Sequence, residues 1–411
     1  MRERLVVVGN GMSSLRFLER LDAHAGDRFD VTVVGAEASP AYNRILLSSL
    51  LAGEVEEEAT RFRDLPWYVQ QRIHLITGVT VTDVDLAGRR VHGEGGLRLD
   101  YDRLVLATGS TPIRLPRPGM GLPGVITFRD LTDVTLMREA ARRDARAVVI
   151  GGGLLGLEAA YGLARLGVDT TLLHVCDRLM ERQLDARAAG LLKRAMEARG
   201  IKVVLHADTA AVEGEAEAEA VRLVDGRVFP ADLVVVAVGV RPQAELARAC
   251  GLAVGRGVRV DDQMRASAPG VYAIGECVEH RGQVYGLVEP GYAQAEVLAR
   301  HLAGEPASYE GTVLSTKLKV SGVPVFSAGE IGDDTEAEPI LLTDPVSGAY
   351  RKLLVREGRL VGAVLVGDAA EGTWYQELIQ SGEPVSPIRH QLMFGRPKAE
   401  GSKPEGARLA A

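Results

Sequence analysis

Short apolar runs alternate with segments of helical spacing along most of this chain. One run extends from Leu5 to Val8 and another from Ala147 to Ile150, and a glycine-rich turn follows each of them. Continuous runs of valine, leucine and isoleucine are typical of strands buried on both faces of a parallel sheet. Their alternation with helical segments predicts an α/β protein built on parallel sheets.

The two glycine-rich turns share one spacing of small residues. Their first, third and sixth positions are Gly9, Gly11 and Ser14 in one copy and Gly151, Gly153 and Gly156 in the other. In a dinucleotide-binding turn, the first glycine makes the bend, the second admits a diphosphate and the third lets the helix pack on the strand. Serine is small enough for that last role. Two copies predict two dinucleotides, and hydride transfer is the usual reason for two to meet. An ordinary glycine turn is the alternative for either copy.

The strand that follows each helix ends in a residue placed to read an adenosine ribose. Glu37 comes shortly after the run Phe29 to Val34, where a carboxylate accepts hydrogen bonds from ribose hydroxyls. In the second copy His174 takes this place after the run Asp169 to Leu173, and it would not repel a 2′-phosphate as a carboxylate would. The residues themselves therefore leave NADH and NADPH open. The alternatives are a solvated acid for Glu37 and a histidine that faces water for His174.

A further strand in each half ends in small residues. The run from Leu104 leads into Thr108 and Gly109, and the run from Asp232 leads into Gly239. Small residues at a strand exit let a cofactor lie against the backbone. An ordinary buried strand with a glycine turn is again the alternative.

The composition is that of an ordinary soluble globular protein. Of the 411 residues, 46% are apolar and 25% are charged, which suits about two or three domains that each bury a core. The net charge of −7 argues against a nucleic-acid partner. No apolar run approaches the ~20 residues of a membrane span, and the first run is too short for the core of a signal peptide. We therefore expect a cytoplasmic protein without a membrane partner.

The three cysteines form no motif. Cys176, Cys250 and Cys277 are far apart, so the sequence has no dithiol pair and no set of four that could hold an iron–sulfur cluster. We interpret each as a small buried hydrophobic residue. No metal site is expected.

Together these features resemble the two-dinucleotide-binding flavoprotein reductases of the pyridine nucleotide-disulfide oxidoreductase superfamily, which include glutathione, rubredoxin and ferredoxin reductases. The chain is similar in particular to the FAD- and NAD(P)H-binding part of assimilatory nitrite reductase large subunits. The matching stretches lie at residues 9–12, 42–48, 151–159, 179–185, 238–242, 275–282 and 315–322. The stretches from Tyr42 to Ser48 and from Gly275 to His280 are more specific than the glycines.

The resemblance implies two Rossmann-like, three-layer dinucleotide-binding domains. An FAD-binding domain of residues 1–114 and 243–308 would be split by an inserted NAD(P)H-binding domain of residues 115–242. A small C-terminal α+β domain of residues 311–392 would follow, with strand-like runs that start at Lys352 and Leu360. Residues 396–411 are rich in lysine, glycine, proline and alanine, and we expect a disordered tail there.

The resemblance also implies roles for single residues. The residues expected to bind FAD are Gly9, Gly11, Ser14, Glu37, Arg44, Val81, Thr108, Gly109, Gly275 and Glu276. Those expected on the NAD(P)H side, together with His174, are Gly151, Gly153, Gly156, Glu158 and Gly239. Arg44 would pair with an FAD phosphate, which suits a guanidinium, and Glu276 stands where most relatives have an aspartate that binds the ribityl chain. Lys317 would lie beside the flavin, where a cation stabilises a reduced, anionic ring; a solvated lysine is the alternative.

The function that the resemblance implies is FAD-dependent NAD(P)H oxidation. Electrons would pass to an external iron–sulfur, siroheme or molybdenum protein in assimilatory nitrite or nitrate reduction. Nitrite reductase large subunits continue into cysteine-rich segments and a siroheme domain, which these residues do not contain, so we expect delivery to a separate protein. The alternatives are a rubredoxin or ferredoxin reductase of another pathway and a redox-sensing interaction module. A monomer or a homodimer is expected.

Overall fold

The computed structural model describes residues 2–143, 145–313, 315–318, 322–332, 336–344 and 346–396. The chain forms two compact units: the larger comprises Met1–Asp177 and Met196–Leu314, and the smaller comprises Arg178–Ala195 and Ser315–Ala411. Apart from Arg396, the expected tail lies outside the described residues. Among the helices that are described, none combines the length and hydropathy that a membrane crossing requires.

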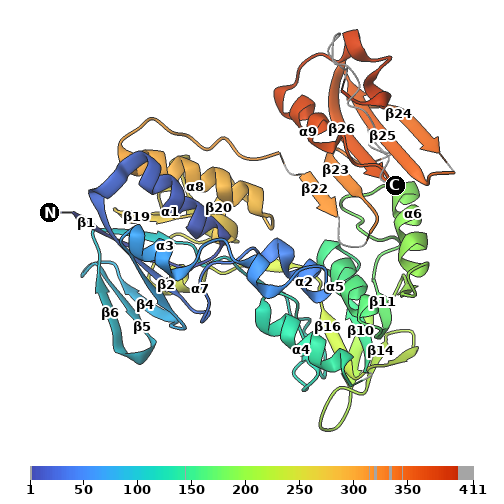
Figure 1. Ribbon diagram of the computed structural model, residues 1–411, viewed down its shortest axis with the longest axis horizontal. Coiled ribbons are helices and arrows are strands. Elements are labelled where there is room, and N and C mark those ends of the chain that lie inside the picture. Colours follow the sequence, from blue (N-terminus) through green and yellow to red (C-terminus); the bar gives the residue numbers. More distant parts are fainter. Residues whose placement is uncertain are drawn as a thin grey trace, which may run out of the picture. The chain divides into compact units, whose positions relative to one another are not determined.

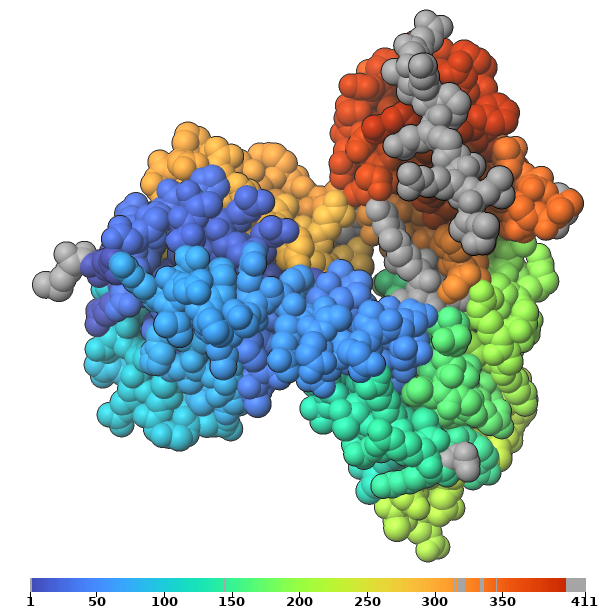
Figure 2. Space-filling view, viewed as in Figure 1, coloured from blue at the N-terminus to red at the C-terminus, as the bar shows by residue number. Residues whose placement is uncertain are grey.

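The first glycine turn follows the central strand of a five-stranded parallel sheet in the larger unit (Figure 1). Its order is β19 (Val271–Ala273), β7 (Arg103–Leu106), β1 (Glu3–Val8), β2 (Phe29–Gly35) and β3 (Ile73–Thr77). Helices α1 (Met12–Ala25) and α8 (Val288–Ala303) lie side by side, seen in blue and orange in Figure 2. Their apolar side chains, such as Phe17 and Leu298, share a buried core with β-strand residues such as Val33.

The second glycine turn follows the central strand of a second five-stranded parallel sheet in the same unit. Its order is β12 (Lys202–Val204), β11 (Asp169–Leu173), β10 (Arg146–Ile150), β16 (Leu233–Val236) and β9 (Val125–Ile126). Helices α4 (Leu131–Ala141) and α5 (Leu154–Arg165) belong to this part of the chain. Each of the two parallel sheets contains a predicted apolar run as a strand, and a glycine turn follows that strand. These sheets confirm the predicted α/β fold class.

Each parallel sheet carries a small antiparallel sheet. The first is β4 (Val81–Asp85), β5 (Arg90–Gly93) and β6 (Leu97–Asp100), and the second is β13 (Thr209–Glu213), β14 (Ala220–Leu223) and β15 (Val228–Pro230). Val84 and Val91 of the first pack in one core with Leu104 and Leu106 of β7. The repeat predicted from the glycine turns therefore extends to whole layers.

Two short strands join the halves of the larger unit. These are β8 (Ser110–Pro112) and β17 (Val240–Pro242), which pair antiparallel where the chain leaves one half and returns from the other. The remaining elements of this unit are α2 (Leu47–Leu51), α3 (Leu65–Gln70), α7 (Glu245–Ala249), β18 (Val258–Val260), β20 (Val278–His280) and β21 (Gln283–Val284). Its short 3-10 helices are η1 (Gly26–Arg28), η2 (Arg44–Leu46), η3 (Glu57–Thr60), η4 (Glu94–Gly96) and η5 (Gly275–Cys277).

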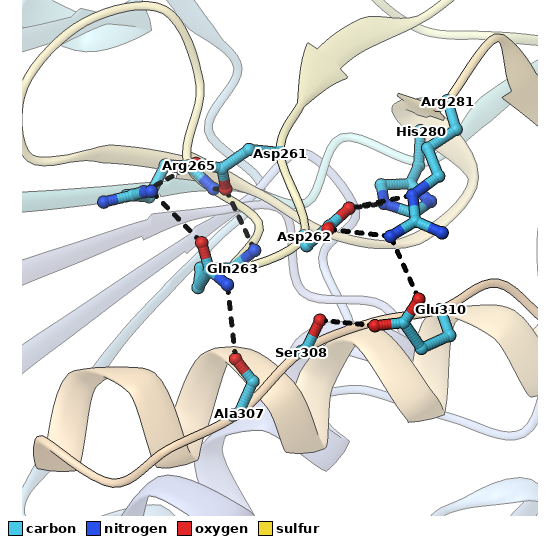
Figure 3. Close-up of polar contacts among 9 residues, drawn as sticks. All are labelled: Asp261, Asp262, Gln263, Arg265, His280, Arg281, Ala307, Ser308 and Glu310. Carbon is cyan, nitrogen blue, oxygen red and sulfur yellow. Dashed lines mark hydrogen bonds and ion pairs between the residues drawn. The ribbon is translucent and has the colours of Figure 1, made fainter.

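A charged network holds the segment that follows α8 (Figure 3). Arg281 donates to Asp262 at 3.0 and 2.7 Å and forms an ion pair with Glu310 at 3.0 Å. Asp262 also lies 2.8 Å from the Nε2 of His280, and Ser308 donates to Glu310 at 2.7 Å. Hydrogen bonds from Arg281 and His280 lower the pKa of Asp262 to about 2. The network therefore ties the segment around residue 310 to the strands of the first half.

The smaller unit is built on an antiparallel sheet. Its order is β22 (Ser315–Leu318), β23 (Val325–Gly329), β26 (Arg359–Val366), β25 (Ala349–Arg356) and β24 (Glu338–Asp344). Helix α9 (Gly372–Ser381) packs on it, and α6 (Ala186–Glu197), η6 (Ser386–Ile388) and η7 (Leu392–Phe394) complete the helices. The buried Asp185 accepts a hydrogen bond from Tyr350 at 2.9 Å and lies 3.7 Å from Lys352. The expected C-terminal α+β fold is confirmed.

Candidate dinucleotide-binding sites

The first glycine turn has the geometry of a diphosphate site. Gly9 has a φ of 110°, and a Cβ there would overlap the carbonyl oxygen of Ala107. Gly11 occupies the N-cap position of α1, and no side chain caps the helix there. A Cβ at Gly11 would meet no atom within 4 Å. The free N–H groups at the start of α1 thus face space that a diphosphate can enter. The buried Ser14 Oγ and Asn10 Nδ2 have no hydrogen-bond partner among the described residues, which also fits a polar ligand.

The second glycine turn has the same geometry. Gly151 has a φ of 121°, and a Cβ there would overlap the carbonyl oxygen of Ala237. Gly153 caps α5 without a side-chain hydrogen bond, and a Cβ at Gly153 would again meet no atom within 4 Å. A Cβ at Gly156, in contrast, would overlap the carbonyl oxygen of Gly151. Both turns therefore combine glycines that the fold requires with one that leaves room for a ligand.

The structure brings Glu37 and Arg44 together. They form an ion pair, and Tyr42 donates a hydrogen bond to Glu37 at 2.7 Å. A second nitrogen of Arg44 donates to the carbonyl oxygen of Arg129 at 2.9 Å. Glu37 is therefore oriented by two partners rather than simply solvated. Val81 begins β4 and is half-buried, next to a segment anchored by the hydrogen bond from the Gly78 N–H to the Glu37 carbonyl oxygen.

Glu276 is held by two side chains that the sequence did not indicate. Arg129 and Ser110 each donate to its Oε2 at 2.6 Å, and the carboxylate side chain is only 17% exposed. The preceding Gly275 N–H donates to the buried Gln294 at 2.7 Å. Arg129 lies in an irregular segment between β9 and α4, where no motif marks it. Only the folded chain brings these residues to the same place.

The two small strand exits meet at the crossing of β8 and β17. Thr108 donates to the carbonyl oxygen of Gln243 at 2.6 Å, and the Gln243 N–H donates to the Gly109 carbonyl oxygen at 2.9 Å. The Ile113 N–H donates to the Gly239 carbonyl oxygen at 2.9 Å. The matched strand ends seen in the sequence therefore lie at one junction.

His174 does not face water. Its side chain is buried, and its Nδ1 accepts a hydrogen bond from the Gly152 N–H at 3.0 Å. The water-facing alternative is wrong because the imidazole turns back to the glycine turn of its own half. A nitrogen that accepts a hydrogen bond carries no proton, so this contact requires an unprotonated Nδ1.

Glu158 lies in α5, beyond the second glycine turn, and reaches α2. Ser48 donates a hydrogen bond to its Oε2 at 2.5 Å. Burial raises the pKa of Glu158 to about 7, and the hydrogen bond from Ser48 acts in the opposite direction. No sequence pattern pairs these two residues. Lys317 lies in β22 of the smaller unit, and its side chain is outside the described residues.

The cysteines offer no reactive pair. None of the three cysteines forms a disulfide. Cys277 is buried, while Cys176 and Cys250 are partly exposed, so full burial was a correct prediction only for Cys277. Burial raises the pKa of both the Cys277 and the Cys250 thiols. A raised pKa keeps a thiol protonated and weakly nucleophilic.

A family model described as pyridine nucleotide-disulphide oxidoreductase matches residues 3–297. The chain belongs to this family. A second model, described as the C-terminal domain of rubredoxin NAD+ reductase, matches residues 315–383. Membership makes the chain an oxidoreductase and implies binding of FAD and NAD(P)H, and it confirms the resemblance inferred from the motifs.

Among characterised relatives, the chain is 46% identical over 386 residues to an NAD(P)H nitrite reductase of Bacillus subtilis, covering 94% of this chain and 48% of the relative. It is 39% identical over 393 residues to the assimilatory nitrate reductase electron transfer subunit of the same organism, covering 95% and 51%. The chain thus spans about half the length of these two relatives. It is also 30% identical to the ferredoxin–NAD(+) reductase subunit of a benzene 1,2-dioxygenase system from Pseudomonas putida, covering 94% and 95%.

Solved structures of similar fold are also reductases. The putidaredoxin reductase in a covalent complex with putidaredoxin has a TM-score of 0.84 at 26% identity, covering 94% of this chain and 95% of that one. A ferredoxin reductase from Rhodopseudomonas palustris has a TM-score of 0.86 at 25% identity, covering 94% and 96%. These similarities extend over both units of the chain.

Proposed function

We propose that this chain oxidises NAD(P)H by way of FAD and passes the electrons to an external metalloprotein, as the electron-transfer component of assimilatory nitrite or nitrate reduction. The observation that carries the proposal is the pair of glycine turns, each with an uncapped helix start that faces open space. Relatives at 46% and 39% identity, named for nitrite reduction and for electron transfer to nitrate reductase, support the pathway.

The first half would hold FAD and the second NAD(P)H. In this assignment the diphosphate of FAD lies at Gly9, Gly11 and Ser14, its adenosine ribose at Glu37, and one phosphate near Arg44. Val81 contacts the adenine, and Thr108, Gly109, Gly275 and Glu276 line the remainder. The diphosphate of NAD(P)H lies at Gly151, Gly153 and Gly156, with Glu158, His174 and Gly239 around it. The segments 1–114 and 243–308 would form the FAD-binding domain and 115–242 the NAD(P)H-binding domain.

The side chains of this site position and orient rather than exchange atoms. FAD, when bound, supplies the acceptor for a hydride and releases electrons one at a time to a metal centre. Holding two reactants in register accounts for most of the rate in such a transfer. The crossing of β8 and β17 joins the two halves next to Thr108 and Gly239, so it is the element that sets their register. Thiols with raised pKa values disfavour a disulfide relay.

The test is anaerobic reduction of the purified protein. A yellow protein that bleaches on addition of NADH or NADPH is expected, followed by reoxidation when a siroheme or molybdenum acceptor protein is added. A bound flavin that neither nucleotide bleaches would refute the hydride step. Bleaching without transfer to either acceptor would refute the pathway alone.

A second candidate acceptor is a rubredoxin or ferredoxin. The match of residues 315–383 to a rubredoxin reductase domain, and a relative of 30% identity over almost the whole chain that is named for ferredoxin, favour it. Reoxidation of the bleached protein by a [2Fe–2S] ferredoxin or a rubredoxin, but not by the nitrite or nitrate enzymes, would select this candidate.

A further inference from the structure

Glu158 is a partly buried carboxyl group, and Ser48 is its single polar partner among the described residues. Its Oε2 accepts a hydrogen bond of 2.5 Å from the hydroxyl of Ser48, which is only 2% exposed. No ion pair to Glu158 is present among the described residues. A partly buried carboxylate without a cation is disfavoured, so the free energies of its two protonation states lie closer together at neutral pH than those of a fully solvated carboxyl group. Burial raises the pKa of Glu158 to about 7, in agreement with this environment.

The elements packed around α5 do not supply a compensating charge. These are α2, α4, β10, β11 and β16. Neither α2 nor β16 contains a charged residue. The other elements contain five charged residues. Arg138 donates to the Leu50 carbonyl oxygen, Arg146 pairs with Asp232, and Asp133 accepts hydrogen bonds from the Arg129 N–H and the Thr127 hydroxyl. The remaining two are Asp169 and Glu139. None of them bonds to Glu158, so Ser48 is the one polar side chain of these elements that stabilises its ionised form.

The pair lies where the two halves of the site meet. Glu158 comes two residues after Gly156, in the helix whose start faces open space. Ser48 is one of the buried residues of α2, shortly after Arg44. The helices are in close contact, because a Cβ on Gly162 would come within 2.6 Å of the Leu51 side chain. Ser48 and Glu158 thus connect the segment assigned to FAD with the helix assigned to NAD(P)H.

Resting on the proposed function, we propose that the Ser48–Glu158 pair is a proton-holding switch that couples the charge of Glu158 to the oxidation state of the nicotinamide. The dihydronicotinamide ring is neutral, whereas the oxidised ring carries a positive charge. A carboxylate in a medium of low dielectric constant stabilises the charged ring and not the neutral one. In the transfer, two electrons and one proton leave the nicotinamide C4 together for the flavin. Glu158 exchanges no atom with either ring, and the proton that it loses on ionisation passes to water, so it acts as a positioning residue.

The sign of the pH dependence follows from this coupling. Binding of NAD+ or NADP+ favours ionised Glu158, so the affinity for the oxidised nucleotide rises as the pH rises through about 7. Bound oxidised nucleotide in turn lowers the pKa of Glu158, and a tenfold preference corresponds to a shift of about one unit. The affinity for NADH or NADPH changes little over the same range.

The experiment measures the equilibrium affinities of NAD+, NADP+, NADH and NADPH for the flavin-containing protein from about pH 6 to about pH 8 by calorimetry. We expect about a tenfold rise in affinity for the oxidised form of the preferred nucleotide in the natural protein. Glu158→Gln should abolish the rise, and Ser48→Ala should move its midpoint to higher pH because a hydrogen bond to the carboxylate is lost. Glu139→Gln and Ser49→Ala, on α4 and α2, are matched controls and should behave as the natural protein.

Infrared difference spectroscopy supplies a second measurement that does not require nucleotide. The natural protein should show a protonated-carboxyl band that titrates near pH 7 and is absent in Glu158→Gln. A pH-independent affinity for the oxidised nucleotide, or a slope that survives in Glu158→Gln as a histidine would produce, overturns the proposal. If Glu158→Gln fails to fold, the infrared titration of the natural protein and Ser48→Ala still decides. Failure of the proposed function would differ, since neither nucleotide would then bleach the flavin.

Discussion

The two halves of the larger unit share one fingerprint but differ in how tightly the helix approaches its strand. A Cβ at Gly156 would overlap the carbonyl oxygen of Gly151, whereas the corresponding position of the first half is filled by the buried Ser14. The halves also differ at the end of the second strand. Glu37 is paired with Arg44 and Tyr42, while His174 accepts a hydrogen bond from its own glycine turn. One motif therefore supports two packings and two different sets of contacts at the end of the second strand.

The largest effect is expected when the middle glycine of either turn is replaced. Gly11→Val should give nearly colourless protein, and Gly153→Val should keep its flavin but lose NAD(P)H binding. In each case the new side chain enters open space that the diphosphate needs. Loss of two charge-assisted hydrogen bonds costs about 3–6 kcal/mol, a loss of affinity of about 100-fold or more. Flavin content and nucleotide binding by calorimetry measure the two effects.

Unchanged far-ultraviolet circular dichroism in both variants would show that the fold is retained, since no atom lies within 4 Å of either new Cβ. If both substitutions removed the flavin equally, the assignment of one dinucleotide to each half would be wrong.

Substitutions at the third small residue of each glycine turn should affect the stability of the two halves differently. Gly156→Ser should lower the free energy of unfolding by about 3 kcal/mol or more, because the added atoms overlap backbone that cannot move cheaply. The opposite exchange, Ser14→Gly, should cost only about 0.5 kcal/mol from helix propensity. Urea unfolding measures both. Similar losses in the two variants would remove the proposed difference in packing.

The strand-end residue should tune the choice of nucleotide. An acid at position 174 would repel a 2′-phosphate, so His174→Asp should lower the ratio of kcat/KM for NADPH to that for NADH by about tenfold, equivalent to about 1.4 kcal/mol. Steady-state kinetics with both nucleotides measure the ratio. His390→Asp, an exposed residue of the smaller unit, is the control and should leave it unchanged. An unaltered ratio in His174→Asp would mean that the ribose is read elsewhere.

The smallest effect is expected in the charged network that holds the segment after α8, where the free energy of unfolding should depend on pH. The pKa of Asp262 is lowered to about 2, so its ionised form contributes stability that is complete above its unfolded pKa of about 3.9 and is lost as the pH falls toward 2. Asp262→Asn should therefore be slightly less stable than the natural protein at pH 7. The difference should shrink as the pH falls from about 4 to about 2 in thermal unfolding. A difference that does not depend on pH would point to lost packing instead of lost charge.

Much of this architecture was predictable from local patterns. The apolar runs at Leu5 and Ala147 and the glycines after them are local signals, because a buried parallel strand and a diphosphate turn each restrict the residues at fixed spacings. The same holds for Glu37 and for the strand exits at Thr108 and Gly239. The alternative of a water-facing His174 was wrong, because the direction of a side chain at a strand end depends on what it meets after folding.

What the sequence determined by itself is the fold class, the doubling of the dinucleotide turn and the family, since each depends on residues close together in the chain. The tertiary structure alone decided the partners: Arg129 and Ser110 on Glu276, Ser48 on Glu158, and Gly152 on His174. These contacts join residues distant along the chain, and hydrogen bonds and burial act over a few ångströms of space. No spacing in the sequence encodes that proximity, so the charge of Glu158 and the orientation of His174 followed only from the folded chain.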